Sequence, residues 1–405
     1  MHAIYNLFIG LYRIILRFLA LFNRKIDTML KGQKRCFDVL KTIPSNKKIV
    51  WFHCASLGEF EQGRPLIERL KETNPEYKVL LSFYSPSGFE IRKDYSFADW
   101  VVYLPDDSES NAKRFVSLVN PYMTFFVKYE FWYNYLIALK GRRVFQVSLI
   151  MRPSQYFFKP YGKWFAKKLG VFEHFFVQNE QTKDLLNSIG YDNVTISGDT
   201  RFDRVIQISR NTKSFPEIEK FFSKDKKTLL AGSSWEADET IIASAFKQRN
   251  DLKLIIAPHL VDKNHIASIQ NLFPDSVLYS EVKTNDLSKY SVLIIDCIGI
   301  LSSLYKYCDI AYIGGGFGAG IHNTLEAATF GKPICFGKRY NHFQEAVDLV
   351  EREAAFAINN SEELSTILNL LCDDDVFYNN AAKASVEYTN EKAGACDRIF
   401  NYLHL

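Results

Sequence analysis

The stretch that decides the fold is Ile49-Val50-Trp51-Phe52-His53-Cys54-Ala55-Ser56-Leu57-Gly58-Glu59-Phe60. It is a short, mostly apolar run that meets a turn of small residues, and an amphipathic stretch at Gln62–Glu72 follows. Apolar runs of this length that precede a glycine turn and a helical pattern are typical of strands buried on both faces. Gly58 permits a tight turn between the two elements. The stretch therefore predicts a strand–loop–helix unit of a parallel α/β sheet.

The same alternation extends along most of the chain in two series. Strands are predicted at Ile49–Cys54, Lys78–Phe83, Trp100–Tyr103, Met123–Val127, Arg143–Ser148, His174–Val177 and Thr195–Ser197, and then at Thr228–Gly232, Lys253–Ala257, Val292–Ile295, Ile310–Ile313 and Pro333–Phe336. Helices are predicted between them, for example at Asn111–Val119, Asp238–Gln248, Lys263–Gln270, Ile300–Tyr307 and Thr324–Phe330. Strands that alternate with helices form parallel sheets with right-handed crossovers. The fold class is therefore α/β, with two doubly wound, Rossmann-like domains.

The domain boundaries follow from a polar stretch between the two series. We expect a basic N-terminal segment at 1–35, a first domain at 36–205, a linker at 206–227 and a second domain at 228–405. The last part of that second domain, Asp375–Leu405, is predicted to be helical.

Composition and charge exclude several classes of protein. The 405 residues are 47% hydrophobic and 24% charged, which is ordinary for a globular protein and excludes a disordered or collagen-like chain. The net charge of +4 is uneven, because residues 1–35 carry +6 and the rest of the chain −2. A general nucleic-acid-binding surface is not expected on a body with this charge.

The seven cysteines favour a reducing compartment. Their number is odd, no pair has CxxC spacing, and most have apolar neighbours. Clustered ligands for zinc are not visible, so no metal is expected.

Residues 3–22 form an apolar segment that contains Arg13 and Arg17. Twenty residues just cross a bilayer, but each central arginine would cost ~2.5–3.5 kcal/mol. Because the two arginines share one helical face, the pattern predicts a helix in the membrane interface or a short tilted span. The basic residues that follow would keep the body of the protein in the cytoplasm. A buried first helix of a soluble domain is the alternative.

Three loops after strands of the first domain carry candidate catalytic residues. Glu59 is expected at a helix N-terminus, where the helix dipole would keep it ionised, although the spacing alone favours a carboxylate that only complements the helix end. Glu130 lies among aromatic residues and is equally compatible with a sugar-binding or a capping role. Arg201 could pair with an anionic ligand, although a solvated arginine is the simpler interpretation.

Loops of the second domain carry candidate ligand-binding residues. Gly232-Ser233-Ser234 precedes an acidic helix start and could cradle a phosphate, with Ser234 as the N-cap. Pro258-His259 follows a strand, where a lone histidine is more often structural.

The most informative loop is 314–326, which has five glycines in seven residues at its start. We found no structural reason for so many glycines, so we expect the loop to serve a ligand. The glycines do not match the GxGxxG dinucleotide fingerprint, and no Walker loop is present. Glu326, in the first turn of a following helix, could accept hydrogen bonds from both hydroxyls of a nucleotide ribose.

Taken together these pieces resemble the 3-deoxy-D-manno-octulosonate (Kdo) transferases of lipopolysaccharide synthesis. The matching residues are Ser56–Glu59, Tyr129–Trp132, Gly198–Asp203, Gly232–Ser234, Ala257–His259 and His322–Glu326. The resemblance implies a two-domain GT-B fold with the active site in the cleft between the domains. It also implies inverting transfer of Kdo from CMP-Kdo to a lipid A precursor (lipid IVA), without a metal or other cofactor. Members are anchored at the cytoplasmic face of the cell inner membrane.

The resemblance also assigns roles to individual residues. Glu59 matches the general base, Glu130 an acid that supports the transition state, and Arg201 a position where many members have lysine. The residues that match CMP-binding segments or belong to the phosphate and glycine loops are Ser233, Ser234, Pro258, His259, Ile298, Gly299, Ile300, Gly316, Asn323, Thr324, Leu325 and Glu326. The family often has arginine at His259 and an acid at Ile300.

Two other functions are compatible with parts of the sequence. Another GT-B enzyme, such as an N-acetylglucosaminyl transferase or a nucleotide-sugar epimerase, would share the glycine loop and the late glutamate. A membrane-tethered nucleotide-binding module without turnover would share the fold and the N-terminal segment.

Overall fold

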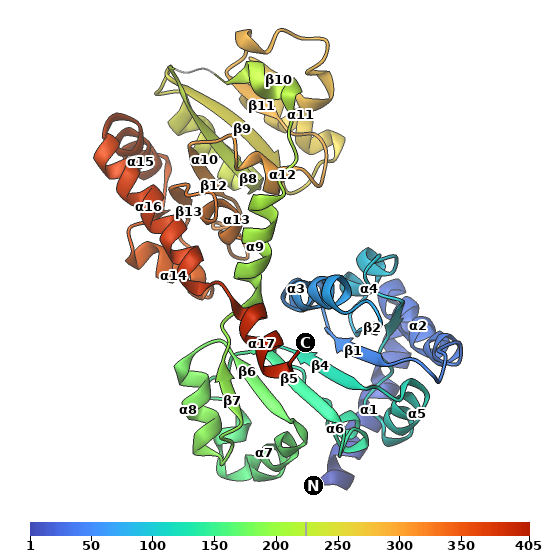
Figure 1. Cartoon of the computed structure of the whole chain (residues 1–405). Helices are drawn as coiled ribbons and strands as arrows, with labels where there is room; N and C mark the ends of the chain where they lie inside the picture. Colours follow the sequence, from blue (N-terminus) through green and yellow to red (C-terminus); the bar gives the residue numbers. More distant parts are fainter. Residues whose placement is uncertain (223–224) are drawn as a thin grey trace. The chain divides into compact units, whose positions relative to one another are not determined.

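The computed structural model describes residues 1–222 and 225–405, which form two compact α/β units. The first unit contains residues 1–204 and 393–405, and the second contains residues 205–392 (Figure 1). Each unit is built on one seven-stranded sheet whose paired strands are parallel. The predicted doubly wound α/β architecture is therefore confirmed in both units.

The sheet of the first unit has the strand order β3-β2-β1-β4-β5-β6-β7. Its strands are β1 (Ile49–His53), β2 (Lys78–Phe83), β3 (Trp100–Tyr103), β4 (Met123–Val127), β5 (Arg143–Leu149), β6 (His174–Val177) and β7 (Val194–Ile196). All seven were predicted within one residue at each end. The strand order reverses between β1 and β4, and ligands of open parallel sheets bind beyond the carboxyl ends of the strands at such a point.

Helices cover both faces of this sheet. They are α1 (His2–Ala20), α2 (Arg24–Leu40), α3 (Leu57–Thr73), α4 (Pro86–Arg92), α5 (Glu109–Val119), α6 (Tyr133–Ala138), α7 (Lys163–Lys168), α8 (Glu180–Ser188) and α17 (Ala395–Leu403), with 3₁₀ turns at Tyr156–Phe158, Pro160–Gly162 and Leu169–Val171. Alternate residues of β1 enter two different cores: Trp51 packs in one buried cluster and Phe52 in the other. This two-sided burial is why the strand reads as an uninterrupted apolar run.

The second unit has the strand order β10-β11-β9-β8-β12-β13-β14. Its strands are β8 (Lys227–Ser234), β9 (Leu252–Pro258), β10 (Ser276–Leu278), β11 (Val292–Ile294), β12 (Ile310–Ile313), β13 (Ile334–Gly337) and β14 (Ala355–Ile358). Its helices are α10 (Glu236–Phe246), α11 (Lys263–Leu272), α12 (Leu301–Leu304), α13 (Leu325–Ala328), α14 (Gln344–Glu351), α15 (Ser361–Asp373) and α16 (Asp375–Lys392), with 3₁₀ turns at Pro216–Phe221, Tyr279–Glu281 and Leu287–Lys289. The two outermost strands, β10 and β14, were not predicted.

The unit boundaries differ from the predicted domains in two places. The predicted linker, 206–227, is largely structured, because α9 (Thr200–Arg210) and the 3₁₀ turn at Pro216–Phe221 occupy much of it. Residues 223–224 of that linker lie outside the described residues. The chain end was assigned wholly to the second domain, but residues 393–405 belong to the first unit.

Contacts made by α17 explain this return of the chain end (Figure 1). The Asp203 carboxylate accepts hydrogen bonds from the backbone N–H of Gly394 (2.6 Å) and of Cys396 (2.7 Å). Cys396, Ile399, Phe400 and Leu403 then enter the same buried cluster as Phe52. An amphipathic pattern alone cannot show which of two cores a terminal helix will join.

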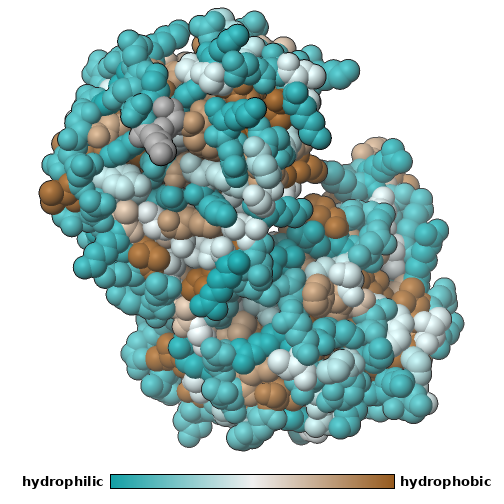
Figure 2. Space-filling view, turned by 45° about the horizontal axis from the view of Figure 1, so that its top comes forward, coloured by the Kyte–Doolittle hydropathy of each residue, from teal (hydrophilic) through white to brown (hydrophobic). Residues whose placement is uncertain are grey.

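The helix α1 is apolar on its exposed side. Its length and composition would allow it to cross a membrane, and only 6% of its apolar stretch is buried inside the structure. The exposed apolar residues of α1 and the turn after it include Leu7, Phe8, Leu11, Ile14, Phe18 and Phe22. By contrast, hydrophobic residues on the face of the molecule shown in Figure 2 form small groups within a hydrophilic surface.

Candidate active site

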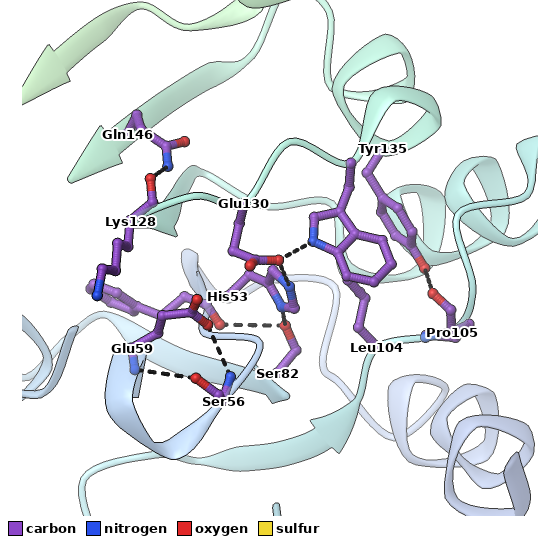
Figure 3. A network of polar contacts seen from close by, with 12 residues as sticks. His53, Ser56, Glu59, Ser82, Leu104, Pro105, Lys128, Glu130, Tyr135 and Gln146 are labelled. Carbon is purple, nitrogen blue, oxygen red and sulfur yellow. Dashed lines mark hydrogen bonds and ion pairs between the residues drawn. The ribbon is translucent and has the colours of Figure 1, made fainter. Parts of the chain in front are cut away.

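The loops after β1 and β4 place two carboxylates near each other at the switch point of the first sheet. Glu59 lies in the first turn of α3, directly after β1, and Glu130 lies in the loop between β4 and α6. Figure 3 shows both side chains beyond the ends of these strands. Two of the three predicted catalytic residues are thus brought together by adjacent strands that are far apart in the sequence.

Glu59 forms a capping box at the start of α3. The backbone N–H of Ser56 donates to Oε2 of Glu59 at 2.9 Å, and the N–H of Glu59 donates to Oγ of Ser56 at 3.5 Å. The carboxylate therefore does complement the helix end, as the sequence pattern favoured. Capping fixes its position, and this leaves its second oxygen available for chemistry.

The environment of Glu59 overturns the expectation that the helix end keeps it ionised. Burial and the nearby charge of Glu130 raise the pKa of Glu59 to about 7, against the opposing effects of Ser56 and of the Lys128 ammonium. Desolvation and a like charge therefore outweigh the helix dipole. A carboxyl group that titrates near pH 7 is suited to accept a proton at physiological pH.

Glu130 is fixed by two nitrogen atoms. Its Oε2 accepts a short hydrogen bond from Nε1–H of Trp132 and lies 3.2 Å from Nε2 of His53. The side chain is only 12% exposed. Because His53 is fully buried at the end of β1, it holds Glu130 from inside the sheet.

The histidine is oriented by neighbours on β1 and β2. Nδ1 of His53 lies 2.9 Å from Oγ of Ser82 (Figure 3). The same Oγ accepts a hydrogen bond from Nε1–H of Trp51 at 2.8 Å. These four side chains form a continuous series of hydrogen bonds if the Ser82 hydroxyl donates to Nδ1 of His53 and Nε2–H of His53 donates to Glu130. The sequence analysis missed His53 and Ser82 as site residues. The signal was their place at the carboxyl ends of adjacent strands, where they pair in register.

Lys128 supplies a positive charge to this group and was also missed. Its backbone adopts a left-handed conformation, with φ of +65°, immediately after β4. The backbone is held there by Nε2–H of Gln146, which donates to the Lys128 carbonyl at 2.7 Å. Strained backbone of this kind is concentrated at functional sites.

The third predicted catalytic residue, Arg201, is engaged by an internal partner. Its guanidinium pairs with the buried Asp199 at 2.9 Å, and Asp199 also accepts a hydrogen bond from Gln62 of α3 at 3.0 Å. The Arg201 side chain is 31% exposed and held in an ion pair, so it is not the fully solvated arginine of the simpler interpretation. Through Asp199 it is connected to Gln62 of α3, the helix that carries Glu59 in its first turn.

In the second unit the corresponding switch point lies between β8 and β12. Ser233 and Ser234 end β8, and the glycine-rich loop follows β12. Ser233 has a positive φ of 53°. The two predicted ligand loops therefore lie side by side at the edge where ligands of such sheets bind.

The glycines of this loop have a structural reason that the sequence analysis did not see. A Cβ atom on Gly314 would lie 2.2 Å from the carbonyl oxygen of Ser233, and one on Gly316 would lie 2.5 Å from Cα of Gly337. Gly315 has a φ of +94°, and its N–H donates to Asp238 at 2.8 Å. Glycine is therefore required here by close contact between backbone segments, whether or not the loop also binds a ligand.

The prediction that Ser234 caps α10 is wrong. Its hydroxyl is fully buried and donates to Oε1 of Glu239 at 2.8 Å. The helix start is instead served by Asp238, which accepts from the N–H of Trp235 at 3.0 Å. Glu239 in turn lies 2.9 Å from Nε2 of His265, so Ser234 belongs to a buried polar cluster.

Three aromatic rings stack beside these loops. The ring of His259 lies 4.6 Å from that of Trp235 and 4.6 Å from that of His322, and Nε1–H of Trp235 donates to Nε2 of His322 at 3.0 Å. Burial and then the proximity of His259 lower the pKa of His322. His259 therefore has a stacking role. The sequence analysis assigned no role to Trp235 or to His322, because aromatic stacking across three loops leaves no local pattern.

The remaining predicted donor residues divide by exposure. His259, Ile298, Gly299 and Asn323 are exposed, Ser233, Ile300 and Glu326 are half-buried, and Ser234, Pro258, Gly316, Thr324 and Leu325 are buried. Glu326 lies in the first turn of α13, as predicted, and its Oε1 accepts a hydrogen bond from Nδ2–H of Asn323 at 3.1 Å. Only the exposed and half-buried side chains can contact a ligand without rearrangement.

Comparisons with known proteins agree on the family. The family model described as 3-deoxy-D-manno-octulosonic-acid transferase (kdotransferase) matches residues 31–204. The chain is 28% identical to the 3-deoxy-D-manno-octulosonic acid transferase of Aquifex aeolicus over 83% of this chain and 91% of that one. It is 25% identical to the enzyme of the same name from Haemophilus influenzae over 87% and 86%. A bifunctional glycosyltransferase/methyltransferase of Fusobacterium nucleatum is 27% identical, and the chain spans about half of its length (52%).

Solved structures with similar folds include UDP-N-acetylglucosamine 2-epimerases. The epimerase from Neisseria meningitidis has a TM-score of 0.61 at 17% identity and covers 88% of this chain and 99% of its own. That from Listeria monocytogenes has a TM-score of 0.57 at 16% identity, covering 87% and 95%. At such identities the likeness establishes only the GT-B type of fold. Residues 31–204 thus match the 3-deoxy-D-manno-octulosonic acid (Kdo) transferase model, and the chain is similar to transferases of that name along most of its length.

Proposed function

We propose that the protein transfers Kdo from CMP-Kdo to a lipid A precursor such as lipid IVA, with inversion at the anomeric carbon. The observation that carries the proposal is the carboxyl group of Glu59, whose pKa is raised to about 7 next to Glu130 at the switch point of the first sheet. Similarity to the Kdo transferases indicates which sugar is transferred, and this carboxyl group would act as the base.

The reaction needs a base because a sugar hydroxyl is a poor nucleophile. As the acceptor oxygen bonds to the anomeric carbon, its proton passes to the ionised carboxylate of Glu59. The bond from the anomeric carbon to the phosphate oxygen breaks, and CMP leaves with its electron pair. Glu130, held by His53 and Trp132, would stabilise the positive charge that develops on the sugar.

Residues of the second unit would bind the donor. Asn323 and Glu326, linked by their own hydrogen bond, offer acceptors for the ribose hydroxyls. Trp235 and His259, the exposed members of the Trp235–His259–His322 stack, offer an aromatic ring face for a cytosine ring. Ser233 and the adjacent backbone would meet the phosphate, and we propose that no metal takes part.

We further propose that the protein acts at the cytoplasmic face of the inner membrane, with α1 in contact with the lipid. Ten apolar residues between Ile4 and Phe22 are exposed on α1 and the following turn. The hydroxyl of Tyr84 donates to that of Tyr12 on α1 at 3.0 Å, and the Tyr84 ring lies 4.9 Å from that of Trp132. The helix is thus connected to the residue that holds Glu130, which suits an acceptor embedded in a membrane.

The test is to incubate the full chain with CMP-Kdo and a tetra-acylated lipid A precursor and to measure product mass. We expect an increase by one or more Kdo units and release of CMP. The Glu59→Gln variant should bind CMP-Kdo but transfer ~10²–10⁴-fold more slowly. Glu72→Gln, at the exposed far end of the same helix, is the matched control and should behave like wild type.

Two results would contradict the proposal. Wild-type activity in the Glu59→Gln variant would show that Glu59 is not the general base. Binding of UDP in preference to CMP, with no Kdo transfer, would instead point to an epimerase or another GT-B enzyme.

A further inference from the structure

A cavity of about 500 Å³ lies between α1, α2 and α5 in the first unit. The proposed transfer reaction does not use it. Its charged lining residues are five bases and two acids, which give a net charge of +3: Arg13, Arg17, Lys31, Lys34, Arg114, Asp27 and Asp106. A cavity with this charge would attract an anion.

The two acids neutralise only two of these bases. Arg13 pairs with Asp106 at 3.2 Å, and Lys31 pairs with Asp27 at 2.6 Å. Among the described residues, Arg17, Lys34 and Arg114 have no ion-pair partner within 4.0 Å, and all three are exposed. Three cations around one cavity match the several oxygen atoms of a phosphate group.

The rest of the lining is apolar and continuous with the exposed side of α1. Leu16 and Phe37 are buried in the wall, and Leu21, which is 74% exposed, lies at the end of the helix. Phe18, one helical turn earlier, and Phe22, the next residue, are 61% and 78% exposed. A free phosphate ion would gain no binding free energy from this apolar surface. A phosphate attached to hydrocarbon chains would gain it, because the chains would cover the apolar surface.

Contacts along α1 hold the helix against the first unit. One face of the helix is tied to the unit: the Tyr5 hydroxyl donates to Asp107 at 2.6 Å, and Nδ2–H of Asn134 donates to Asn6 at 2.8 Å. Arg13 extends this face through its ion pair with Asp106. A helix that crossed the membrane would have to break these contacts, so α1 lies along the unit. Its apolar side then enters the membrane surface while the basic cavity stays among the headgroups.

We propose that the cavity between α1 and α2 binds the phosphate headgroup of one anionic phospholipid of the bilayer, whose acyl chains lie along the exposed side of α1. Arg17, Lys34 and Arg114 contact the phosphate. The site rests on the membrane contact proposed above for α1, but it does not depend on the transfer reaction.

The test measures headgroup binding by the full-length protein without any sugar substrate. Dihexanoyl-phosphatidylglycerol, kept below its critical micelle concentration, is titrated into the protein by calorimetry. Dihexanoyl-phosphatidylcholine and inorganic phosphate are titrated in parallel. We expect saturable one-to-one binding of the phosphatidylglycerol, and binding at least tenfold weaker for the other two probes.

The pocket variant is Arg17→Gln/Lys34→Gln, and the control is Arg24→Gln/Lys25→Gln. The control removes the same charge from the exposed start of α2, outside this cavity. Circular dichroism is used to check that both variants are folded. We expect both to fold, because none of the four side chains has an ion-pair partner among the described residues. Two lost charge-assisted contacts should weaken phosphatidylglycerol binding at least tenfold in the pocket variant relative to the control.

Vesicles separate this site from the membrane contact on which it rests. Binding is measured by co-sedimentation with phosphatidylcholine vesicles that contain either none or about one-third phosphatidylglycerol. We expect the pocket variant to lose the preference for phosphatidylglycerol vesicles, and the control to keep most of it. Equal losses in both variants would show diffuse attraction and overturn the headgroup site, as would equally tight binding of inorganic phosphate. If wild-type protein binds neither kind of vesicle, the membrane contact itself fails.

Discussion

Nε2 of His53 lies 3.2 Å from Oε2 of Glu130, and this contact joins the end of β1 to the loop after β4. It connects a fully buried residue to a carboxylate that raises the pKa of Glu59. Glu59, Glu130 and His53 are therefore coupled, and the contribution of each can be tested by mutation.

The pH dependence of stability should reveal the titration of Glu59. A carboxyl whose pKa is raised to about 7 in the folded state binds a proton there more tightly than in the unfolded chain. Folding stability is then greatest below the ordinary carboxyl pKa and falls as pH rises toward 7. Glu59→Gln keeps the capping box but cannot ionise, so it should lose less stability than wild type between pH 5 and pH 8. We expect a difference on the order of 1–3 kcal/mol by denaturant unfolding; parallel curves would contradict the raised pKa.

The pH dependence of activity should change when Glu130 loses its charge. Glu59 must be ionised to act as a base, so kcat/KM should rise with pH through about 7. Glu130→Gln removes a like charge, which lowers the pKa of Glu59 and moves the rise to lower pH while reducing the maximal rate. Glu173→Gln, an exposed acid of the same unit, serves as the control. An unshifted profile in Glu130→Gln would show that the two carboxyl groups are not coupled.

Ser82 should act as a positioning residue for His53. Ser82→Ala leaves Nε1 of Trp51 and Nδ1 of His53 without their shared partner, at a cost of ~1–3 kcal/mol in stability. It also frees His53 to present its lone pair to Glu130, so we expect lower kcat with little change in KM and a shifted pH profile. Thr124→Val on β4, which pairs with β1, removes a buried hydroxyl that has no hydrogen-bond partner among the described residues, and it should leave both properties unchanged. A stability loss in Ser82→Ala without any kinetic change would restrict Ser82 to a structural role.

Glu326 should contribute to nucleotide affinity. Replacement by alanine removes the acceptor proposed for the ribose hydroxyls and the partner of Asn323. We expect CMP binding to weaken at least tenfold by calorimetry, since hydrogen bonds to charged groups contribute ~1.5–3 kcal/mol. Glu351→Ala, an exposed acid at the end of α14, should leave the affinity unchanged. Equal CMP affinity in Glu326→Ala and wild type would remove Glu326 from the donor site.

Much of the fold could be read from the sequence because buried parallel strands leave a local signal. Apolar runs such as Lys78–Phe83 and Met123–Val127 were predicted with the observed bounds, since two-sided burial dictates their composition. Glu59 and Glu130 could be chosen because each follows such a strand. Capping of α3 by Glu59 was equally local.

Other properties depend on contacts between residues far apart in the chain, and only the tertiary structure decided them. The sequence could not show that Glu130 comes close enough to Glu59 to raise its pKa, because that effect needs β1 and β4 to be neighbours. Nor could it show that Arg201 pairs with a buried Asp199, or that α17 returns to the first core. Local composition determines which segments become strands and helices. Desolvation, charge coupling and the choice of core depend on distances that only packing sets.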